Sequence, residues 1–280
     1  MPVRRRADSR FRRVFRILPF GMLPLIGTSV GLLAGLVTGF SGASGVMVVI
    51  PLVTLLLGIP IHQAIGTSLL ADVLISTPVA WSYWRYGDVR LGRVLYLLMG
   101  ALVGAQFGAH EAGTVPSTFL AFALSVFLLG MGVVMYRRGL PKVRFASALN
   151  SEMKVPSFLS HPLGLLGIGV LLGVLTGLFG AGGGLLAFLV LYFVLCLPLR
   201  EAVGTSAAFM LFAALSGALG YVGEGSIRAW LGILIGTGGI IGGTLASYIA
   251  HHVPDYILAR VIGGLFLVLG VGMLLLRVWA

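Results

Sequence analysis

The chain has 280 residues, of which 58% are hydrophobic and only 10% are charged. A soluble domain carries roughly 25% charged residues to face water, so this composition excludes an ordinary soluble globule and predicts that lipid is the main solvent. The net charge of +11 would suggest a nucleic-acid partner in a soluble protein, but here the cations gather at the ends of apolar runs and form no nucleic-acid-binding motif.

The N-terminal residues 1–19 form a basic tail that holds seven of the 19 lysine and arginine residues. A basic stretch followed by an apolar run resembles a signal peptide, yet no small-x-small cleavage site clearly follows and the run continues into Gly31–Gly39. We therefore predict a cytoplasmic tail followed by a first membrane helix.

Five apolar segments make up the first half, residues 20–136, and five more make up the second half, residues 161–280. A polar linker at 137–160, predicted to be cytoplasmic, joins the halves. The segments run approximately over 20–39, 44–58, 62–84, 93–110 and 117–136, and then over 162–180, 184–197, 203–222, 229–248 and 256–277. The second segment of each half has only about 15 residues, fewer than the roughly 20 that a helix needs to cross a bilayer. This pattern predicts an all-α polytopic membrane protein with one re-entrant or broken helix per half.

The two halves match each other at an offset of 138 residues without a gap. The triplet Gly66-Thr67-Ser68 aligns with Gly204-Thr205-Ser206, and the same offset pairs Pro60 with Pro198. Abundant glycine would produce some chance matches, but not a shared triplet and a shared proline in one register. The protein is therefore predicted to be a tandem repeat of two five-segment helical units.

The positive-inside rule separates two topologies for this repeat. If all ten segments cross and the N-terminus is inside, nine cations lie inside and ten lie outside. If the second and third segments of each half together make one crossing, 17 lie inside and only Arg200 and Arg260 lie outside. We therefore predict about eight net crossings, with the short second segments entering but not crossing and the chain broken near Pro60 and Pro198. Unwound backbone at that depth is tolerated only where it is buried in protein or lines a polar cavity.

A glycine-rich turn separates the first and second segments of each half, at 39–45 and at 177–184. Glycine allows a positive φ and a close approach to a ligand, and a helix that starts there presents free N–H groups and a positive dipole end to an anion. Close helix packing through small residues is the alternative interpretation. The candidate substrate-binding residues of these turns are Ser41, Ser44, Gly182, Gly183 and Gly184.

The third segment of each half begins with a proline and continues into Gly-Thr-Ser, at 60–68 and at 198–206. Hydroxyl groups in the first turns of a helix can cap its free N–H groups or donate to an oxyanion. A side chain that can be cationic occupies the same position in both segments, although it could equally extend to the membrane interface. The candidate substrate-binding residues here are His62, Thr67, Ser68, Arg200, Thr205 and Ser206. Among the cations we expect Arg200 to matter most for anion affinity, because its planar guanidinium suits an oxyanion.

Asp72 lies within an apolar helix, where a carboxylate costs about 2.5–3.5 kcal/mol on insertion scales. It is a candidate coupling site for a proton or a cation, and a buried structural hydrogen bond is the alternative. Its equivalent in the second half is Met210, so this site is not duplicated. We expect several other titratable residues to lie in loops, namely Asp88, His251, His252 and Asp255.

The sequence Gly42-Ala43-Ser44-Gly45 also fits the GxSG pattern of intramembrane serine proteases. That chemistry needs a base near the serine, such as a histidine on a neighbouring helix. The other histidines lie near segment ends, and the second turn has Gly182 in place of Ser44. We therefore expect no catalytic site. We also expect no metal and no cofactor, since the single Cys196 can form neither an intrachain disulfide nor a cysteine metal site.

The glycine-rich turn, the short helix with Pro51, the Ala-x-Gly-Thr-Ser helix start and their repetition resemble the TauE/SafE family of sulfite exporters. The resemblance covers about residues 25–277 and fits best at Gly180–Gly184, whereas the first half has Ser41 and Ser44 where a fuller glycine run is usual. The resemblance implies export or uptake of small anions such as sulfite or organosulfonates.

We therefore expect a permease in the lipid bilayer of a bacterial inner membrane that binds a small anion between its halves and works by alternating access. Three other functions stay open, namely a passive anion channel, a proton-coupled cation transporter that uses Asp72, and a protease at Ser44. The sequence also leaves open whether the protein forms a homo-oligomer. It does not identify the substrate, the direction of transport or the coupling ion.

Overall fold

The computed structural model describes residues 22–92, 94–111, 161–179, 182–223 and 227–278, together with a few positions between 122 and 137. The basic tail, most of the fifth segment predicted at 117–136 and the linker predicted at 137–160 lie outside the described residues. The described residues contain helices and no strand, which confirms the predicted all-α class. Five of these helices are long and apolar enough to cross a membrane.

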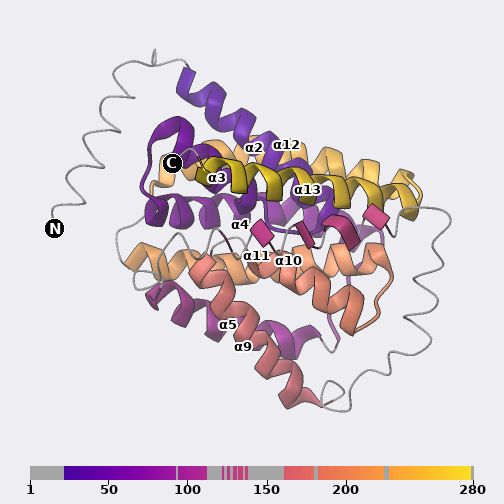
Figure 1. Ribbon diagram of the computed structural model, residues 1–280. Coiled ribbons are helices and arrows are strands. Elements are labelled where there is room, and N and C mark those ends of the chain that lie inside the picture. Colours follow the sequence, from indigo (N-terminus) through magenta and orange to yellow (C-terminus); the bar gives the residue numbers. More distant parts are fainter. Residues whose placement is uncertain are drawn as a thin grey trace.

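The helices of the first half are α2 (Met22–Ser41), α3 (Val46–Leu57), α4 (Ile61–Arg85) and α5 (Val94–Glu111). Those of the second half are α9 (Pro162–Phe179), α10 (Gly182–Leu189), α11 (Leu199–Gly223), α12 (Ala229–His252) and α13 (Asp255–Val278), with a π-helical turn at Val190–Val194 after α10. In Figure 1, α4 and α11 lie through the middle of the bundle, with α2 and α12 on one side and α5 and α9 on the other.

The predicted chain breaks near Pro60 and Pro198 are present. Helix α3 ends at Gly58, whose φ of 63° is left-handed, and Pro60 then precedes the first residue of α4. In the second half the backbone turns at Cys196, which has a φ of 53°, before α11 begins at Leu199. A left-handed residue ends a helix, and proline suits the start of the next one because its missing N–H would have no partner there.

The path of the chain after each break differs from the prediction that the second and third segments of a half together make one crossing. With 12 residues, α3 is about 18 Å long. It starts beside Asp72, near the middle of α4, and ends next to the start of α4. Helices α2 and α3 therefore form a hairpin that turns back at residues 42–45, which we call the first hairpin turn. Helix α4 does not complete a crossing that α3 began, because its 25 residues cover about 37 Å and run the full length by themselves.

The two central helices, α4 and α11, run antiparallel. The backbone N–H of Arg228, which follows α11, donates to Thr67 Oγ1 near the start of α4 at 3.0 Å. The backbone N–H of Arg90, which follows α4, donates to Thr205 Oγ1 near the start of α11, also at 3.0 Å. The end of each helix thus meets the start of the other. We call the two opposite ends of the bundle the Arg90 end and the Arg228 end.

The antiparallel arrangement does not agree with the predicted eight net crossings, because an even number of crossings per half would give α4 and α11 the same direction. The cation count had also put Arg90 and Arg200 on opposite sides of the membrane. In the structure Arg90 forms an ion pair of 3.0 Å with Glu201, so both lie at the same end. The count failed for a physical reason: when equivalent helices point in opposite directions, equivalent loops such as those of Arg90 and Arg228 lie at opposite ends. Cations that occur at equivalent positions in both halves are then divided almost evenly between the two sides of the membrane.

Glycine allows two pairs of helices to pack with their backbones almost in contact. An added Cβ at Gly31 in α2 would overlap the carbonyl oxygen of Ile235 in α12, and one at Gly169 in α9 would overlap that of Leu97 in α5. The same holds one turn further along, where Gly35 meets Gly239. Such close approach is the usual way in which membrane helices associate without a hydrophobic driving force. Each pair joins a helix of one half to a helix of the other.

Candidate functional site

The first hairpin turn lies against the second half in the interior of the bundle. Gly42, with a φ of 62°, is buried, and its carbonyl oxygen accepts a hydrogen bond of 3.0 Å from Ser206 Oγ. An added Cβ at Gly184, in the first turn of α10, would lie 2.9 Å from the backbone nitrogen of Ser44. The two glycine-rich turns therefore meet each other near the middle of α4 and α11, as the hypothesis of a shared site between the halves requires.

Asp72 is bound by the first hairpin turn. The Ser44 hydroxyl donates to Asp72 Oδ2 at 2.6 Å, and the Gly45 N–H donates to Oδ1 at 3.2 Å, while the carboxyl group has no exposed surface. Ser44 Oγ also accepts a hydrogen bond from the N–H of Val46 at 3.2 Å. The carboxyl group therefore lies at the start of α3, where free N–H groups and the helix dipole favour negative charge.

The hydroxyl groups of the two Gly-Thr-Ser helix starts are all buried and all occupied. Thr67 and Thr205 accept the backbone N–H groups of the opposite half, so they tie the halves together instead of capping their own helices. Ser68 donates to the Ile65 carbonyl at 2.8 Å, while Ser206 donates to Gly42 and to the Val203 carbonyl. Of these four residues, Ser206 is the one that contacts the first hairpin turn.

Arg200 points away from the two glycine-rich turns. Its Nη2 donates to the Val253 carbonyl at 2.9 Å, and its Nε forms an ion pair of 3.0 Å with Asp255. Glu201 is bound instead by Arg90, through two hydrogen bonds of 3.0 Å. Hydrogen bonding to Glu201 and the charge of Glu201 raise the pKa of Arg90 above its ordinary value. The structure thus places Arg200 in an ion-pair group at the Arg90 end, while His62 lies in the first turn of α4 and its side chain is outside the described ones.

The remaining candidates hold the turns in shape. Ser41 is buried, donates to the Val37 carbonyl at 2.7 Å and accepts the N–H of Ala43 at 3.1 Å. Gly182 begins α10, and an added Cβ at Gly183 would overlap Thr176 Oγ1. These contacts fit the alternative interpretation of the glycines, close packing, for this part of the turns.

The residues predicted in loops are partly in helices. His251 and His252 form the last turn of α12, and Asp255 begins α13, because the α12–α13 connection is only Val253 and Pro254. Asp88 does lie in a loop, where its carboxylate is 3.0 Å from His251 Nε2. The loop prediction rested on where each apolar run ends, and an apolar run does not include the polar last turn of a membrane helix.

Two tyrosines and one serine were missed as candidates. Tyr83 donates to the Gly39 carbonyl at 2.9 Å and Tyr221 donates to the Gly177 carbonyl at 3.2 Å, so each anchors the helix that precedes a glycine-rich turn. Ser76, one turn beyond Asp72 on α4, is fully buried, and its hydroxyl has no hydrogen-bond partner within the part of the chain that the structure describes. The shared offset of 138 residues was the signal that could have singled out the tyrosines.

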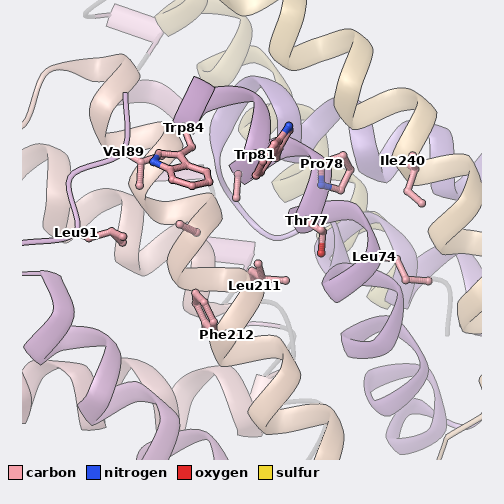
Figure 2. A pocket seen from close by; sticks show the side chains of 12 residues that line it. Leu74, Thr77, Pro78, Trp81, Trp84, Val89, Leu91, Leu211, Phe212 and Ile240 are labelled. Carbon is pink, nitrogen blue, oxygen red and sulfur yellow. The ribbon is translucent and has the colours of Figure 1, made fainter. Parts of the chain in front are cut away.

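A groove of about 560 Å³ opens between α4, α11 and α12, and it is distinct from the meeting point of the turns. Figure 2 shows Trp81, Trp84 and Phe212 around it, and the two indole rings pack edge to face with centroids 5.2 Å apart. The Thr77 hydroxyl already donates to the Val73 carbonyl, and the indole N–H groups of Trp81 and Trp84 are the other polar side-chain groups of the lining. An anion needs convergent donors or positive charge, which this apolar lining does not supply.

Comparisons with known proteins agree on one family. The family model described as Sulfite exporter TauE/SafE matches residues 28–273. The chain is 31% identical over 230 residues to "Probable membrane transporter protein YdhB" of Bacillus subtilis (strain 168), an alignment that covers 82% of this chain and 91% of the relative. It is 27% identical over 248 residues to a "Probable membrane transporter protein" of Xylella fastidiosa (strain Temecula1 / ATCC 700964), covering 83% of this chain and 88% of the relative. No solved structure matches.

Proposed function

Because the chain belongs to the TauE/SafE family of membrane transporters, we propose that it is a permease that carries a small anion such as sulfite or an organosulfonate by alternating access. The protein is an integral membrane protein. The single observation that carries the proposal is the meeting of the two glycine-rich turns in the interior, where Ser206 binds Gly42 and where Ser44 and Gly45 present hydrogen-bond donors. Donors in a buried site with few charges suit an oxyanion.

The proposed architecture is an inverted repeat, with residues 20–136 and 161–280 as the two units. Three kinds of contact support it, because each occurs twice at the offset of 138. Tyr83 with Gly39 matches Tyr221 with Gly177. The bonds from the Arg90 and Arg228 backbones to threonine hydroxyls match each other. The guanidinium groups of the same two arginines bind Glu201 and Gln63, which are also equivalent positions.

This architecture supplies a route for alternating access. In inverted repeats the substrate site lies near the bilayer midplane, where broken helices from both units meet, and one unit rocks against the other. Here the equivalent contacts lie at opposite ends, so opening the Arg90 end would release the Arg90–Glu201 pair while the Arg228–Gln63 contact stays closed. Opening the other end would do the reverse.

The geometry favours an anion over the rival substrates. The partners of Asp72 are an O–H and an N–H donor, whereas a metal cation needs oxygen lone pairs pointing at it. Hydrolysis at Ser44 would need a base to take the hydroxyl proton, and the group that Ser44 contacts is a carboxylate, a much weaker base than histidine. A passive anion channel uses the same donors and is separated from a carrier by kinetics.

The test is flux of radiolabelled sulfite and methanesulfonate into liposomes that contain the purified protein, with empty liposomes as the control. A carrier saturates with substrate and shows counterflow, in which unlabelled anion inside accelerates entry of labelled anion. Saturable counterflow of either anion supports the proposal. Flux that rises linearly and shows no counterflow identifies a channel, and no flux of either anion above empty liposomes refutes the permease of sulfur oxyanions.

A further inference from the structure

Asp72 is a carboxyl group with two hydrogen-bond donors and, among the residues that the structure describes, no nearby cation. The helices against α4 that form its surroundings contribute no charge at its depth: α2 and α3 contain none. Helix α11 carries Arg200 and Glu201 only in its first turn, and α12 carries His251 and His252 only in its last turn. A charged carboxylate here is therefore stabilised by the turn alone, through the Ser44 hydroxyl and the Gly45 N–H.

The second half shows that a turn of this kind does not require a carboxylate for its structure. The positions equivalent to Asp72 and Ser44 are Met210 and Gly182, yet α10 still begins at the second glycine-rich turn and packs against α11. The methionine side chain lies beside Gly184, where an added Cβ would be 3.1 Å from its sulfur. The chain thus contains its own comparison, in which the same architecture forms without the buried acid.

A further donor lies unused beside Asp72. Ser76 is four residues later on α4, which places it on the same face one turn away. Its side chain has no exposed surface and its hydroxyl has no hydrogen-bond partner among the described residues. A buried polar group without a partner is costly, and a ligand or water that accepts from it would remove that cost.

From these contacts, and resting on the proposed permease function, we propose that Asp72 is a resident anion of the first hairpin turn that a substrate oxyanion displaces when Asp72 takes up a proton. The deprotonated carboxylate accepts the Ser44 and Gly45 donors. On protonation an O–H bond forms at one carboxyl oxygen and the proton comes from water. The donors then turn to the oxyanion, with Ser76 as a third. For a monovalent substrate the site carries one negative charge before and after, so each anion that binds brings one proton.

Protonation is needed because two anions would otherwise share a site that water does not screen. Like charges a few ångströms apart in a protein interior weaken binding by several orders of magnitude. A neutral acid removes that repulsion and also stops competing for the donors. Binding of the anion and binding of the proton are therefore linked, and by linkage each strengthens the other.

The test compares wild type, Asp72→Asn and the matched control Asp88→Asn in proteoliposomes, with labelled methanesulfonate and thiosulfate as probes because both keep their charge from about pH 5.5 to about pH 8. In wild type and in Asp88→Asn we expect the apparent affinity for the anion to fall by up to about tenfold for each unit by which the pH rises. In both proteins an inward proton gradient should concentrate the anion inside the liposomes. Asparagine imitates the neutral acid, so Asp72→Asn should exchange the anion at every pH and should not concentrate it. Accumulation by Asp72→Asn equal to wild type overturns the proton coupling while leaving the permease intact. Absence of exchange by wild type overturns both.

A measurement that does not use Asp72→Asn guards against the case in which that variant does not fold. Infrared difference spectra, recorded with and without methanesulfonate above the pH at which Asp72 protonates alone, should show a protonated carboxyl band on binding, and Asp88→Asn should keep that band. Binding without such a band in wild type refutes the displacement. A sodium requirement at fixed pH, with no proton uptake, would identify a metal cation as the coupling ion and refute it equally.

Discussion

Replacing Gly42 by alanine is expected to disrupt the meeting point of the two turns, and Gly58 provides a matched control for it. The two glycines have almost the same backbone, with φ of 62° and 63°, so an added Cβ is strained by about 1–2 kcal/mol in both. At Gly58 the Cβ meets nothing within 4 Å. At Gly42 it overlaps Ser206 Oγ and the Val203 carbonyl.

The difference between the two variants therefore isolates the contact with α11. Overpacking in a buried site costs about 1–3 kcal/mol, and this range includes displacement of the Ser206–Gly42 hydrogen bond. We expect Gly42→Ala to lower the free energy of unfolding by roughly 2–5 kcal/mol and Gly58→Ala by no more than about 2 kcal/mol. Thermal unfolding in detergent measures stability, and counterflow in liposomes measures transport.

Transport should separate the variants more than stability does. Under the proposed function, Gly42→Ala displaces the donors of the first hairpin turn and should lose most of its counterflow, whereas Gly58→Ala should keep it. Equal loss in both variants would show that only backbone strain matters. The meeting of the turns would then have no role in transport, and the reasoning from Gly42 to a substrate site would be refuted.

Three further outcomes are expected. Cysteines introduced at Gly92 and Gly223 in a Cys196→Gly background should react with an impermeant reagent from opposite sides of the membrane, since they lie at the Arg90 end and the Arg228 end; labelling of both from one side contradicts the inverted repeat. Gly35→Ala should destabilise the protein by several kcal/mol, because its Cβ overlaps the Gly239 carbonyl. The control Gly167→Ala, whose Cβ meets nothing within 4 Å, should be neutral or stabilise the protein by up to about 1 kcal/mol. Similar melting temperatures of the two variants would argue against the α2–α12 contact. Arg200→Ala and Asp255→Ala should have matching effects of about 0.2–1 kcal/mol on stability and change anion affinity less than about twofold, because the residues pair with each other in a partly exposed position; a selective loss of affinity in Arg200→Ala would restore it as an anion ligand.

Several features of this protein follow from the sequence alone because they depend on composition or on local chemistry. Too few charges to cover a soluble surface indicate a membrane protein, whatever the fold. The breaks at Pro60 and Pro198 depend on proline and on the residues directly before it. The equivalence of the two halves is visible as a register of 138 residues. These properties need no knowledge of which helices touch.

The orientation of the halves and the partners of the candidate residues depended on the tertiary structure. Asp72 and Ser44 are 28 positions apart, and they meet only because α3 folds back along α4. Thr67 and Thr205 accept their hydrogen bonds from residues 161 and 115 positions away. Arg200 is bound by Asp255 and not by its neighbour Glu201. A cation count cannot find these partners, because charge at a loop records neither helix direction nor contact, and in antiparallel halves the repeated cations at the two ends nearly balance.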